Sequence, residues 1–294
     1  MKLILKVNII LSLCLISSLV SGQTSTSYTV IDDLNHKVHF DSPPQRVITL
    51  APNLTEMIYE LGVDKYLIGN TVYCNYPEAA KQKDKVGDLL TFNYEKILSL
   101  KPDLVFITVE GNTKFAYDKF LELGVKLFIS NPRDYKGIKK SYRDLAEIFQ
   151  KVESAEKTIA AWDSTVNNIT SKAKTYEPVT AMFLIEINPI MIAGEKTFLN
   201  EFIELCGMKN FAKESPLNYP VYSREEILNS DPYYIIYPTE SGADVSSLTN
   251  VFPEWKNLSA VKNNRVILLN WDLFSRPGPR FAEALEVFFN RLHP

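Results

Sequence analysis

The chain of 294 residues is 46% hydrophobic and carries a formal net charge of −3, from 32 basic and 35 acidic residues. This length is long for one hydrophobic core and suits two lobes of ordinary size, and the hydrophobic share is large enough to fill both cores. A slightly acidic chain without a block of basic residues is poorly suited to bind a phosphate backbone, so we exclude nucleic acid as a partner.

Residues 1–22 have the pattern of a secretory signal peptide. Two lysines precede an almost wholly apolar stretch at residues 7–20, and small residues stand before the predicted cleavage site after Gly22. The apolar stretch is shorter than the roughly 20 residues that cross a bilayer. Cys14 follows a leucine rather than the small residue that a lipid anchor requires. We therefore expect export to the periplasm without a lipid anchor.

The mature chain begins with a predicted β-hairpin, formed by residues 28–31 and 37–40 around a short polar turn. Beyond it, short apolar runs alternate with helical patterns, as expected for buried parallel strands that are connected by helices. We predict two α/β lobes, each with a mostly parallel sheet. The predicted strands are residues 47–50, 66–69, 104–107 and 126–129 in the first lobe, and 180–187, 233–237 and 265–269 in the second.

The chain contains a half-sized unit twice, in the same order. Residues 95–107 (EKILSLKPDLVFI) align with residues 225–237 (EEILNSDPYYIIY), with Glu, Ile, Leu and Pro in register. Residues 54–62 likewise align with residues 199–207, and each of these segments has the pattern of an amphipathic helix that ends at a glycine. The repeat indicates that the two lobes share one basic architecture.

A single long helix is predicted to connect the lobes. Residues 154–176 contain no Gly or Pro, and Ile159, Trp162, Val166 and Ile169 form an apolar stripe at three- and four-residue spacing. About 22 helical residues span roughly 33 Å, enough to pass along one lobe and enter the next. Because a flexible linker would contain Gly, Ser or Pro, we expect a stiff connection with a cleft between the lobes. The predicted boundaries are 23–150 for the N-terminal lobe with its hairpin, 151–176 for the connecting helix and 177–294 for the C-terminal lobe.

Late in the chain, residues 270–281 (NWDLFSRPGPRF) combine a Trp, two Phe, an Asp and two Arg with Pro and Gly residues that disfavour regular structure. Ligands of open α/β sheets bind at loops of this kind, beyond the carboxyl ends of the strands. We predict an irregular loop at the cleft, with Pro279 in the first turn of the last helix. Trp271 and Phe274 are alternatively core residues, since apolar side chains are usually buried for packing.

The sequence lacks the residue patterns of common enzymes. It contains no G-x-S-x-G or H-E-x-x-H motif and no glycine loop for phosphate. We therefore expect a protein that is not an enzyme. The alternative is an exported α/β hydrolase or lyase that uses Asp272 and Arg276.

Histidines and cysteines also set limits on the chemistry. His36 and His39 belong to the hairpin and His293 lies beside the C-terminus, so we predict no metal site and no intrinsic cofactor. Cys74 and Cys206 remain in the mature chain, and their spacing alone cannot establish a disulfide. We expect two separate, partly buried thiols.

The chain resembles the helical-backbone class (class III) of periplasmic solute-binding proteins, which serve ABC importers of cobalamin, siderophores and haem. The resemblance covers nearly the whole mature chain and rests on the order of its segments, which are the signal peptide, the hairpin, SPPQRVITLAPNLTEMIYELG, TVYCNYPEAA, NYEKILSLKPDLV, the single helical crossover, INPIMIAGEKTFLNEFIELCG, YPVYSREEIL and RPGPR. It implies a monomer that holds a ligand between its lobes and delivers it to a membrane permease. The implied ligand is cobalamin or a related corrinoid, and an iron-siderophore or haem is the alternative.

The resemblance also implies a set of ligand-contacting residues. Tyr73, Tyr219, Asp272, Phe274 and Arg276 match positions that face the corrinoid in this family. A corrin is a broad disc with an apolar face and a rim of amide groups, so aromatic rings can cover the face while Asp and Arg bond the amides. We therefore expect these five side chains to meet in one cleft.

Glu95 and Glu225 match an exposed acidic residue on each lobe that, in the resembling family, meets arginines of the permease. Ser223 and Glu226 form an S-x-x-E capping box, which gives Glu226 a structural task that Glu225 lacks. Asn93 can likewise cap the helix that contains Glu95. The alternative is that both glutamates only complement the helix dipole, at about 0.3–1 kcal/mol each.

Overall fold

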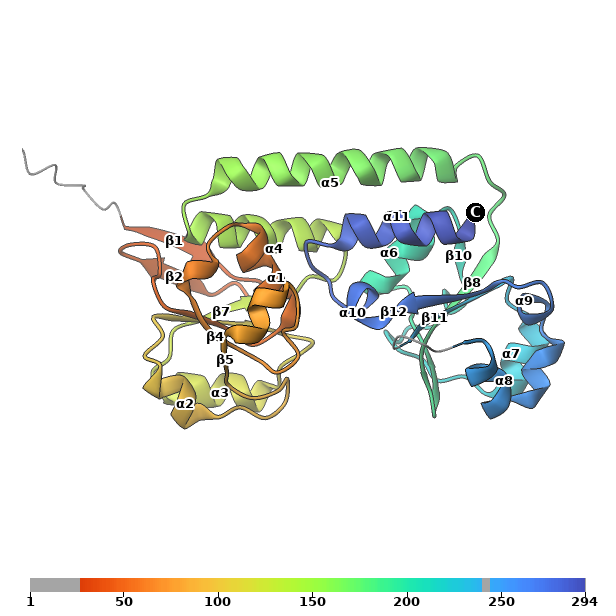
Figure 1. Ribbon diagram of the computed structural model, residues 1–294, viewed down its shortest axis with the longest axis horizontal. Helices are drawn as coiled ribbons and strands as arrows, with labels where there is room; N and C mark the ends of the chain where they lie inside the picture. Colours follow the sequence, from red (N-terminus) through yellow and green to blue (C-terminus); the bar gives the residue numbers. More distant parts are fainter. Residues whose placement is uncertain (1–26, 240–243, 294) are drawn as a thin grey trace, which may run out of the picture.

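The computed structural model of the protein describes residues 27–239 and 244–293. The predicted signal peptide, residues 1–22, lies outside the described residues. Figure 1 shows two α/β lobes at opposite ends of an elongated molecule, with one long helix, α5 (Val152–Ala173), running across both. Within the two described ranges, no helix is long and apolar enough to cross a membrane.

The N-terminal lobe begins with the predicted hairpin, in which β1 (Tyr28–Ile31) pairs antiparallel with β2 (Lys37–Phe40). A parallel sheet follows, made of β3 (Val47–Thr49), β4 (Leu67–Asn70), β5 (Asp84–Lys85), β6 (Leu104–Thr108) and β7 (Leu127–Ser130). Its strand order is β5-β4-β3-β6-β7. Along β6, Phe106 joins the core on one face and Ile107 joins the core on the other. Because both faces are covered, these strands are apolar at nearly every position.

Helices cover both faces of the first sheet. The core of one face includes α1 (Pro52–Glu60) and α4 (Tyr135–Ile148), and that of the other includes α2 (Tyr94–Ser99) and α3 (Lys114–Glu122). The 3₁₀ helices η1 (Asp64–Tyr66) and η2 (Glu78–Gln82) lie in the connections. The side chains of Asn93, Thr113 and Asp134 accept backbone N–H groups at the starts of α2, α3 and α4. These caps satisfy donors that have no partner inside a helix.

The C-terminal lobe has a second sheet of five strands. These are β8 (Thr180–Ile187), β9 (Ile190–Ile192), β10 (Lys209–Asn210), β11 (Tyr234–Thr239) and β12 (Val266–Asn270). The parallel part has the order β10-β8-β11-β12, and β9 pairs antiparallel with β8. The sequence did not predict β5, β9 or β10, because strands of two or three residues are too short to show a period and are set by their pairing partners.

Helices cover the second sheet in the same manner. One face packs against α6 (Phe198–Leu205) and α11 (Phe281–Leu292). The other face packs against α7 (Arg224–Ser230), α8 (Ser246–Val251), η3 (Pro253–Asn257) and α9 (Ser259–Lys262), and the short helix α10 (Trp271–Phe274) follows β12. Both lobes therefore have the predicted α/β architecture with mostly parallel sheets.

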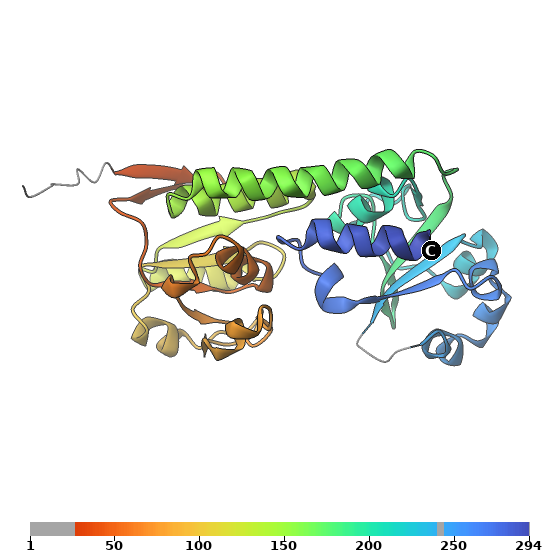
Figure 2. The ribbon, with the colours of Figure 1, turned by 45° about the horizontal axis from the view of Figure 1, so that its top comes forward.

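Helix α5 confirms the predicted helical connection. It spans Val152–Ala173, and the four predicted stripe residues, Ile159, Trp162, Val166 and Ile169, are all buried. It packs against α4 of the first lobe and against α6 and α11 of the second. Near its middle, Trp162 packs against Tyr142 with ring centroids 4.8 Å apart and ring planes tilted by 46°. Figure 2 shows α5 extending over both lobes, so one continuous apolar layer joins them.

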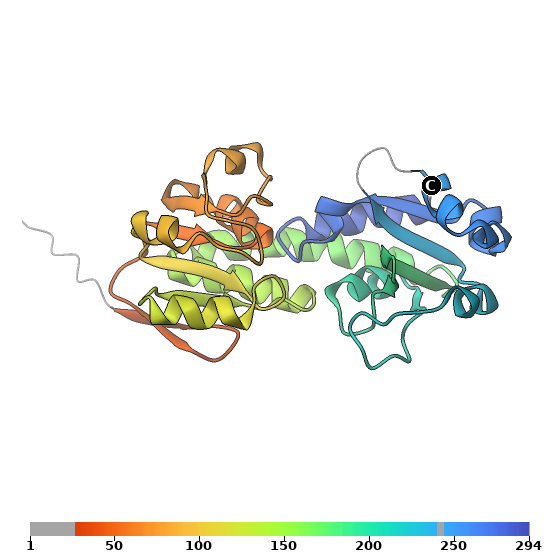
Figure 3. The ribbon, with the colours of Figure 1, turned by 90° about the horizontal axis from the view of Figure 1, so that it is seen from below.

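The internal repeat is present in the topology. Glu95 lies in α2, which precedes β6, and Glu225 lies in α7, which precedes β11. The strand order reverses at β3 in the first sheet and at β8 in the second, and β6 and β11 are the strands beside these positions. Figure 3 shows the two lobes end to end from the side opposite α5. A ligand site is therefore expected at the carboxyl ends of the strands near each reversal.

The two cysteines are separate, as predicted from the sequence. Cys74 and Cys206 are both free thiols, and their residues are 1% and 2% exposed, which is more complete burial than the sequence predicted. Cys74 lies among hydroxyl groups, since the side chains of Thr55 and Thr71 lie 3.1 and 3.2 Å from its sulfur. Neither cysteine serves as a covalent link between the lobes.

Candidate functional site

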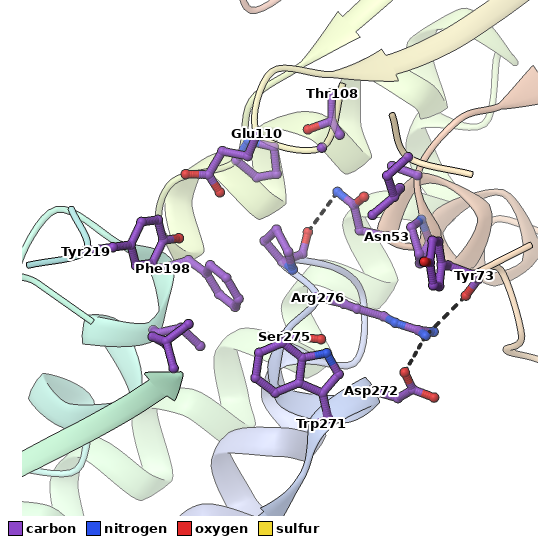
Figure 4. A pocket seen from close by; sticks show the side chains of 18 residues that line it. Asn53, Tyr73, Thr108, Glu110, Phe198, Tyr219, Trp271, Asp272, Ser275 and Arg276 are labelled. Carbon is purple, nitrogen blue, oxygen red and sulfur yellow. Dashed lines mark hydrogen bonds and ion pairs between the residues drawn. The ribbon is translucent and has the colours of Figure 1, made fainter. Parts of the chain in front are cut away.

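A cleft of about 550 Å³ lies between the two lobes, at the carboxyl ends of their strands. Its walls include residues that follow β3, β4, β6 and β7 in the first lobe and β12 in the second. This is the region where ligands of open α/β sheets bind. Figure 4 shows the lining residues, among them Asn53, Tyr73, Thr108 and Glu110 from the N-terminal lobe and Phe198, Tyr219, Trp271, Asp272, Ser275 and Arg276 from the C-terminal lobe.

Four aromatic residues line this cleft, namely Tyr73, Phe198, Tyr219 and Trp271. Tyr73 is 52% exposed and Trp271 is 39% exposed, which is unusual for side chains of this size. Burial, reinforced by the negative charge of Glu110, raises the pKa of Tyr219 to about 12, so its hydroxyl keeps its proton at neutral pH. In Figure 4, Tyr219 and Tyr73 lie on opposite sides of the cleft. The cleft therefore offers flat, partly apolar surface from both lobes.

A buried cluster of charges next to the cleft joins the lobes. The side chain of Glu56, in α1, is 1% exposed, and its carboxylate accepts hydrogen bonds from Arg276 and Arg280. Nε and Nη2 of Arg280 lie 2.9 and 2.7 Å from the two carboxylate oxygens, and Nη1 of Arg276 lies 3.0 Å from Oε1. A buried carboxylate is costly unless it is paired in this way. Glu56 therefore ties the first lobe to the segment that follows β12.

Asp272 and Arg276 extend this cluster to the surface of the cleft. Nη2 of Arg276 lies 2.6 Å from Oδ1 of Asp272 and 3.2 Å from the backbone oxygen of Tyr73. Asn75 donates a hydrogen bond of 2.7 Å to the other Asp272 oxygen. The Asp272 side chain is 46% exposed and that of Arg276 is 8% exposed. Asp272 is thus open to a ligand, whereas Arg276 mainly fixes the position of Asp272.

The segment 270–281 is partly helical, which corrects the predicted irregular loop. Asn270 caps α10 by accepting a hydrogen bond of 3.0 Å from the backbone N–H of Leu273. This cap stabilises one helical turn before the Pro and Gly residues begin. The last helix begins at Phe281, two residues after Pro279, which was predicted to lie in its first turn.

The helical turn of α10 separates two aromatic residues. Phe274 is 0% exposed and packs against Phe202 and Phe288 in the core of the second lobe. The predicted role of Phe274 at the ligand is therefore corrected to that of a core residue, because the turn directs its ring into the apolar layer. Trp271 begins the same turn and lines the cleft instead. Of the five predicted residues, the structure brings Tyr73, Tyr219, Asp272 and Arg276 to one cleft.

Several lining residues were not identified from the sequence. Asn53 follows β3 and Glu110 follows β6, both central strands of the first sheet. Because ligands bind beyond the carboxyl ends of such strands, their positions in the sequence could have identified both as lining residues. The Asn53 side chain donates to the backbone oxygen of Pro277 at 3.3 Å, which adds a direct contact between the lobes. Phe198 begins α6 and is 4% exposed, so its apolar character predicted only burial.

The chemistry of the cleft suits reversible binding. Aromatic rings, two carboxylates and several hydroxyl groups line it. In the part of the chain that the structure describes, no group of three His, Cys, Asp or Glu side chains could hold a metal ion.

His36 lies in the hairpin as predicted, where its ring nitrogen is 3.1 Å from Asp32 and its ring stacks on Tyr117.

Glu95 and Glu225 lie outside the cleft, in the first turns of α2 and α7. Both are exposed. The predicted capping box is present, since Ser223 and Glu226 exchange hydrogen bonds of 3.2 and 2.7 Å. The caps that serve α2 and α7 thus leave Glu95 and Glu225 without a capping task. In Figure 1, α2 and α7 lie on the side of the molecule away from α5.

Comparisons with known proteins agree with this architecture. The vitamin B12-binding protein of Pectobacterium carotovorum subsp. carotovorum is 30% identical over 251 residues, which cover 85% of this chain and 88% of that protein. The vitamin B12-binding protein of Vibrio campbellii is 28% identical over 246 residues, with 83% and 88% covered. Both similarities extend over most of the two lobes.

Solved structures show the same fold. The periplasmic vitamin B12 binding protein of Vibrio cholerae matches with a TM-score of 0.75 and 28% identity, covering 85% of this chain and 97% of that one. A periplasmic heme-binding protein of Roseiflexus sp. RS-1 matches with a TM-score of 0.76 at 22% identity, covering 85% and 98%, and this likeness concerns the fold alone. The family model described as periplasmic binding protein matches residues 47–273. With its two α/β lobes, its single connecting helix and its cleft at the carboxyl ends of the strands, the chain belongs to the periplasmic binding protein family.

Proposed function

We propose that this protein captures cobalamin or a related corrinoid in the cleft and delivers it to the membrane permease of an ABC importer. The observation that carries the proposal is a cleft with aromatic surface from both lobes, in a chain whose relatives are named vitamin B12-binding proteins. In this proposal the protein is a periplasmic monomer, exported through residues 1–22, and it carries out no reaction. Its lobes comprise residues 23–150 and 177–294, with residues 151–176 as the connection.

The lining residues suit a corrinoid. A corrin ring is broad and flat, so the exposed rings of Tyr73 and Trp271, with the half-buried ring of Tyr219, can cover its apolar surface. The amide groups at its rim donate hydrogen bonds, which the Asp272 carboxylate can accept. Arg276 holds Asp272 in place. A cleft that exists before the ligand arrives loses little conformational entropy on binding, which favours affinity.

Co-elution tests the ligand directly. Purified protein mixed with excess cyanocobalamin should keep the red colour through gel filtration at one ligand per protein. The Trp271→Ala variant should retain less. A colourless protein peak would exclude corrinoids as the ligand. Retention of haem or an iron-siderophore instead would establish the alternative ligand class. Chemical change of the ligand during the incubation would favour the exported α/β enzyme.

The proposed partner is an ABC permease, and Glu95 and Glu225 are the proposed contacts. They are exposed, they occupy equivalent places in the two lobes, and no ion pair involves either of them among the described residues. Two carboxylates at a fixed separation can meet two basic sites on one surface, because α5 keeps the lobes apart at a set distance. Binding of the loaded protein to the permease in detergent or nanodiscs tests the assignment.

A further inference from the structure

The cleft holds no cation that is available to a ligand among the described residues. Three charged side chains line it, Glu110, Asp272 and Arg276. Arg276 is committed to two carboxylates, those of Glu56 and Asp272, and it is 8% exposed. A ligand that enters the cleft therefore meets carboxylate oxygens but no unpaired positive charge.

Glu110 is the carboxylate on the wall opposite Tyr219. It follows β6, its side chain is 28% exposed, and one of its oxygens pairs with Arg133. Within residues 27–239 and 244–293, its second oxygen accepts no hydrogen bond. Figure 4 shows the Glu110 carboxylate and the Tyr219 ring pointing toward each other across the cleft. Burial raises the pKa of Tyr219 most, the negative charge of Glu110 raises it further, and the positive charge of Arg133 lowers it.

A partly buried carboxylate discriminates between ligands by their peripheral groups. It accepts a hydrogen bond from an amide N–H, and such a charge-assisted bond is stronger than a neutral one. It repels a ligand carboxylate, and the repulsion is larger here than in open water because the surrounding protein lowers the dielectric constant. Amide-bearing and carboxylate-bearing macrocycles of the same shape are therefore unequal ligands for this cleft.

We propose that Glu110 is a specificity-determining residue, which favours macrocycles with amide donors at the periphery and rejects those with carboxylates there. The proposal rests on the proposed function, since it concerns the same cleft. It goes further by naming the chemical feature that the cleft selects and the side chain responsible. Haem, which carries two propionates, falls in the rejected class.

Matched corrinoids provide the test. Cyanocobalamin and its monocarboxylic derivatives differ by one propionamide that has been hydrolysed to a propionate, so the ring, the metal and the nucleotide are the same. Titration calorimetry on the full chain gives an affinity for each. The wild-type protein should bind the amide at least tenfold more tightly than one of the acid isomers, which corresponds to about 1.4 kcal/mol.

Two variants should move this ratio in opposite directions. Glu110→Gln removes the negative charge and releases Arg133, so the ratio should fall to about threefold or less. Arg133→Gln leaves Glu110 without its cation, so the ratio should rise. Glu177→Gln, an exposed position outside the cleft, should leave it unchanged. A merely structural ion pair would weaken all ligands alike in both variants.

The outcomes separate this inference from the proposed function. If the amide and acid forms bind equally to the wild type, or if neither variant changes their ratio, the role of Glu110 is overturned while corrinoid binding stands. If the wild type binds no corrinoid, the proposed function fails and this inference fails with it. If the acid forms bind more tightly than the amide, the sign of the proposed selection is wrong.

Discussion

Replacement of Glu56 by Gln tests whether the buried charges hold the two lobes together. The substitution keeps the size of the side chain and removes its negative charge. Arg276 and Arg280, which are 8% and 15% exposed, then lose the carboxylate that binds both of them. A glutamine amide also turns N–H donors toward guanidinium donors, so at least one of the present hydrogen bonds cannot form.

The expected loss is large because the cluster is buried. Removal of one partner from a buried ion pair typically costs about 3–5 kcal/mol of unfolding free energy, since the remaining charge is left uncompensated. Arg276 keeps its 2.6 Å contact with Asp272, so we expect Glu56→Gln to cost about 3 kcal/mol. For a chain of this size the melting temperature should fall by roughly 6–12 °C.

Urea unfolding followed by tryptophan fluorescence measures this loss. Glu122→Gln is the control, because Glu122 forms an exposed pair with Lys119 and its replacement should cost less than about 1 kcal/mol. The double variant Glu56→Gln with Arg280→Met should recover part of the stability, since it removes one uncompensated charge. A loss below about 1 kcal/mol for Glu56→Gln, or a double variant that loses the full sum, would refute the role of the cluster.

Three further predictions concern the ligand, the partner and the core. Trp271→Ala should weaken corrinoid binding about 30-fold, or about 2 kcal/mol, in a calorimetric titration, because an aromatic surface is lost from the cleft; an unchanged affinity would exclude this ring from the contact. Glu95→Lys combined with Glu225→Lys should abolish binding to the permease in a pull-down while ligand affinity stays within about twofold, and equal loss in both assays would contradict the separation of the two sites. Burial raises the pKa of the Cys206 thiol to about 12, so alkylation by iodoacetamide at pH 8 should be at least about 100-fold slower in the folded protein than in urea, whereas similar rates would show that the thiol is accessible.

The elements that the sequence predicted well are those with strong local patterns. The buried strand at residues 104–107 is apolar at every position, because both of its faces are covered, and it could be recognised without any partner. The stripe that includes Ile159 and Trp162 likewise marked α5 through its spacing alone. The aligned residues Ile97 and Ile227 are both fully buried, which explains why the repeat is visible in the sequence.

The elements that the sequence missed depend on distant partners. Glu56 lies in an amphipathic helix pattern in which a glutamate indicates an exposed face, yet its side chain is 1% exposed. Its burial is made possible by Arg276 and Arg280, which lie 220 and 224 residues further along the chain. Phe274 is a second example. The resemblance to the family predicted that it contacts the ligand, whereas the helical turn of α10 directs its ring into the core. The pattern of neighbouring residues in the sequence cannot reveal either the pairing of Glu56 with distant arginines or the packing of Phe274 in the core.

Several connections among the described residues hold the walls of the cleft in place. They include the apolar layer of α5, the Glu56 cluster and the contact from Asn53 to Pro277. When the walls are fixed, a poorly matched ligand cannot be accommodated by closing or opening the lobes, so discrimination depends on the groups that line the cleft. A charge mismatch at Glu110 is then more costly than it would be in a flexible site, because neither carboxylate can move away from the other. Loosening the walls through Glu56→Gln should therefore lower the preference for amide over acid corrinoids even though Glu110 itself is intact.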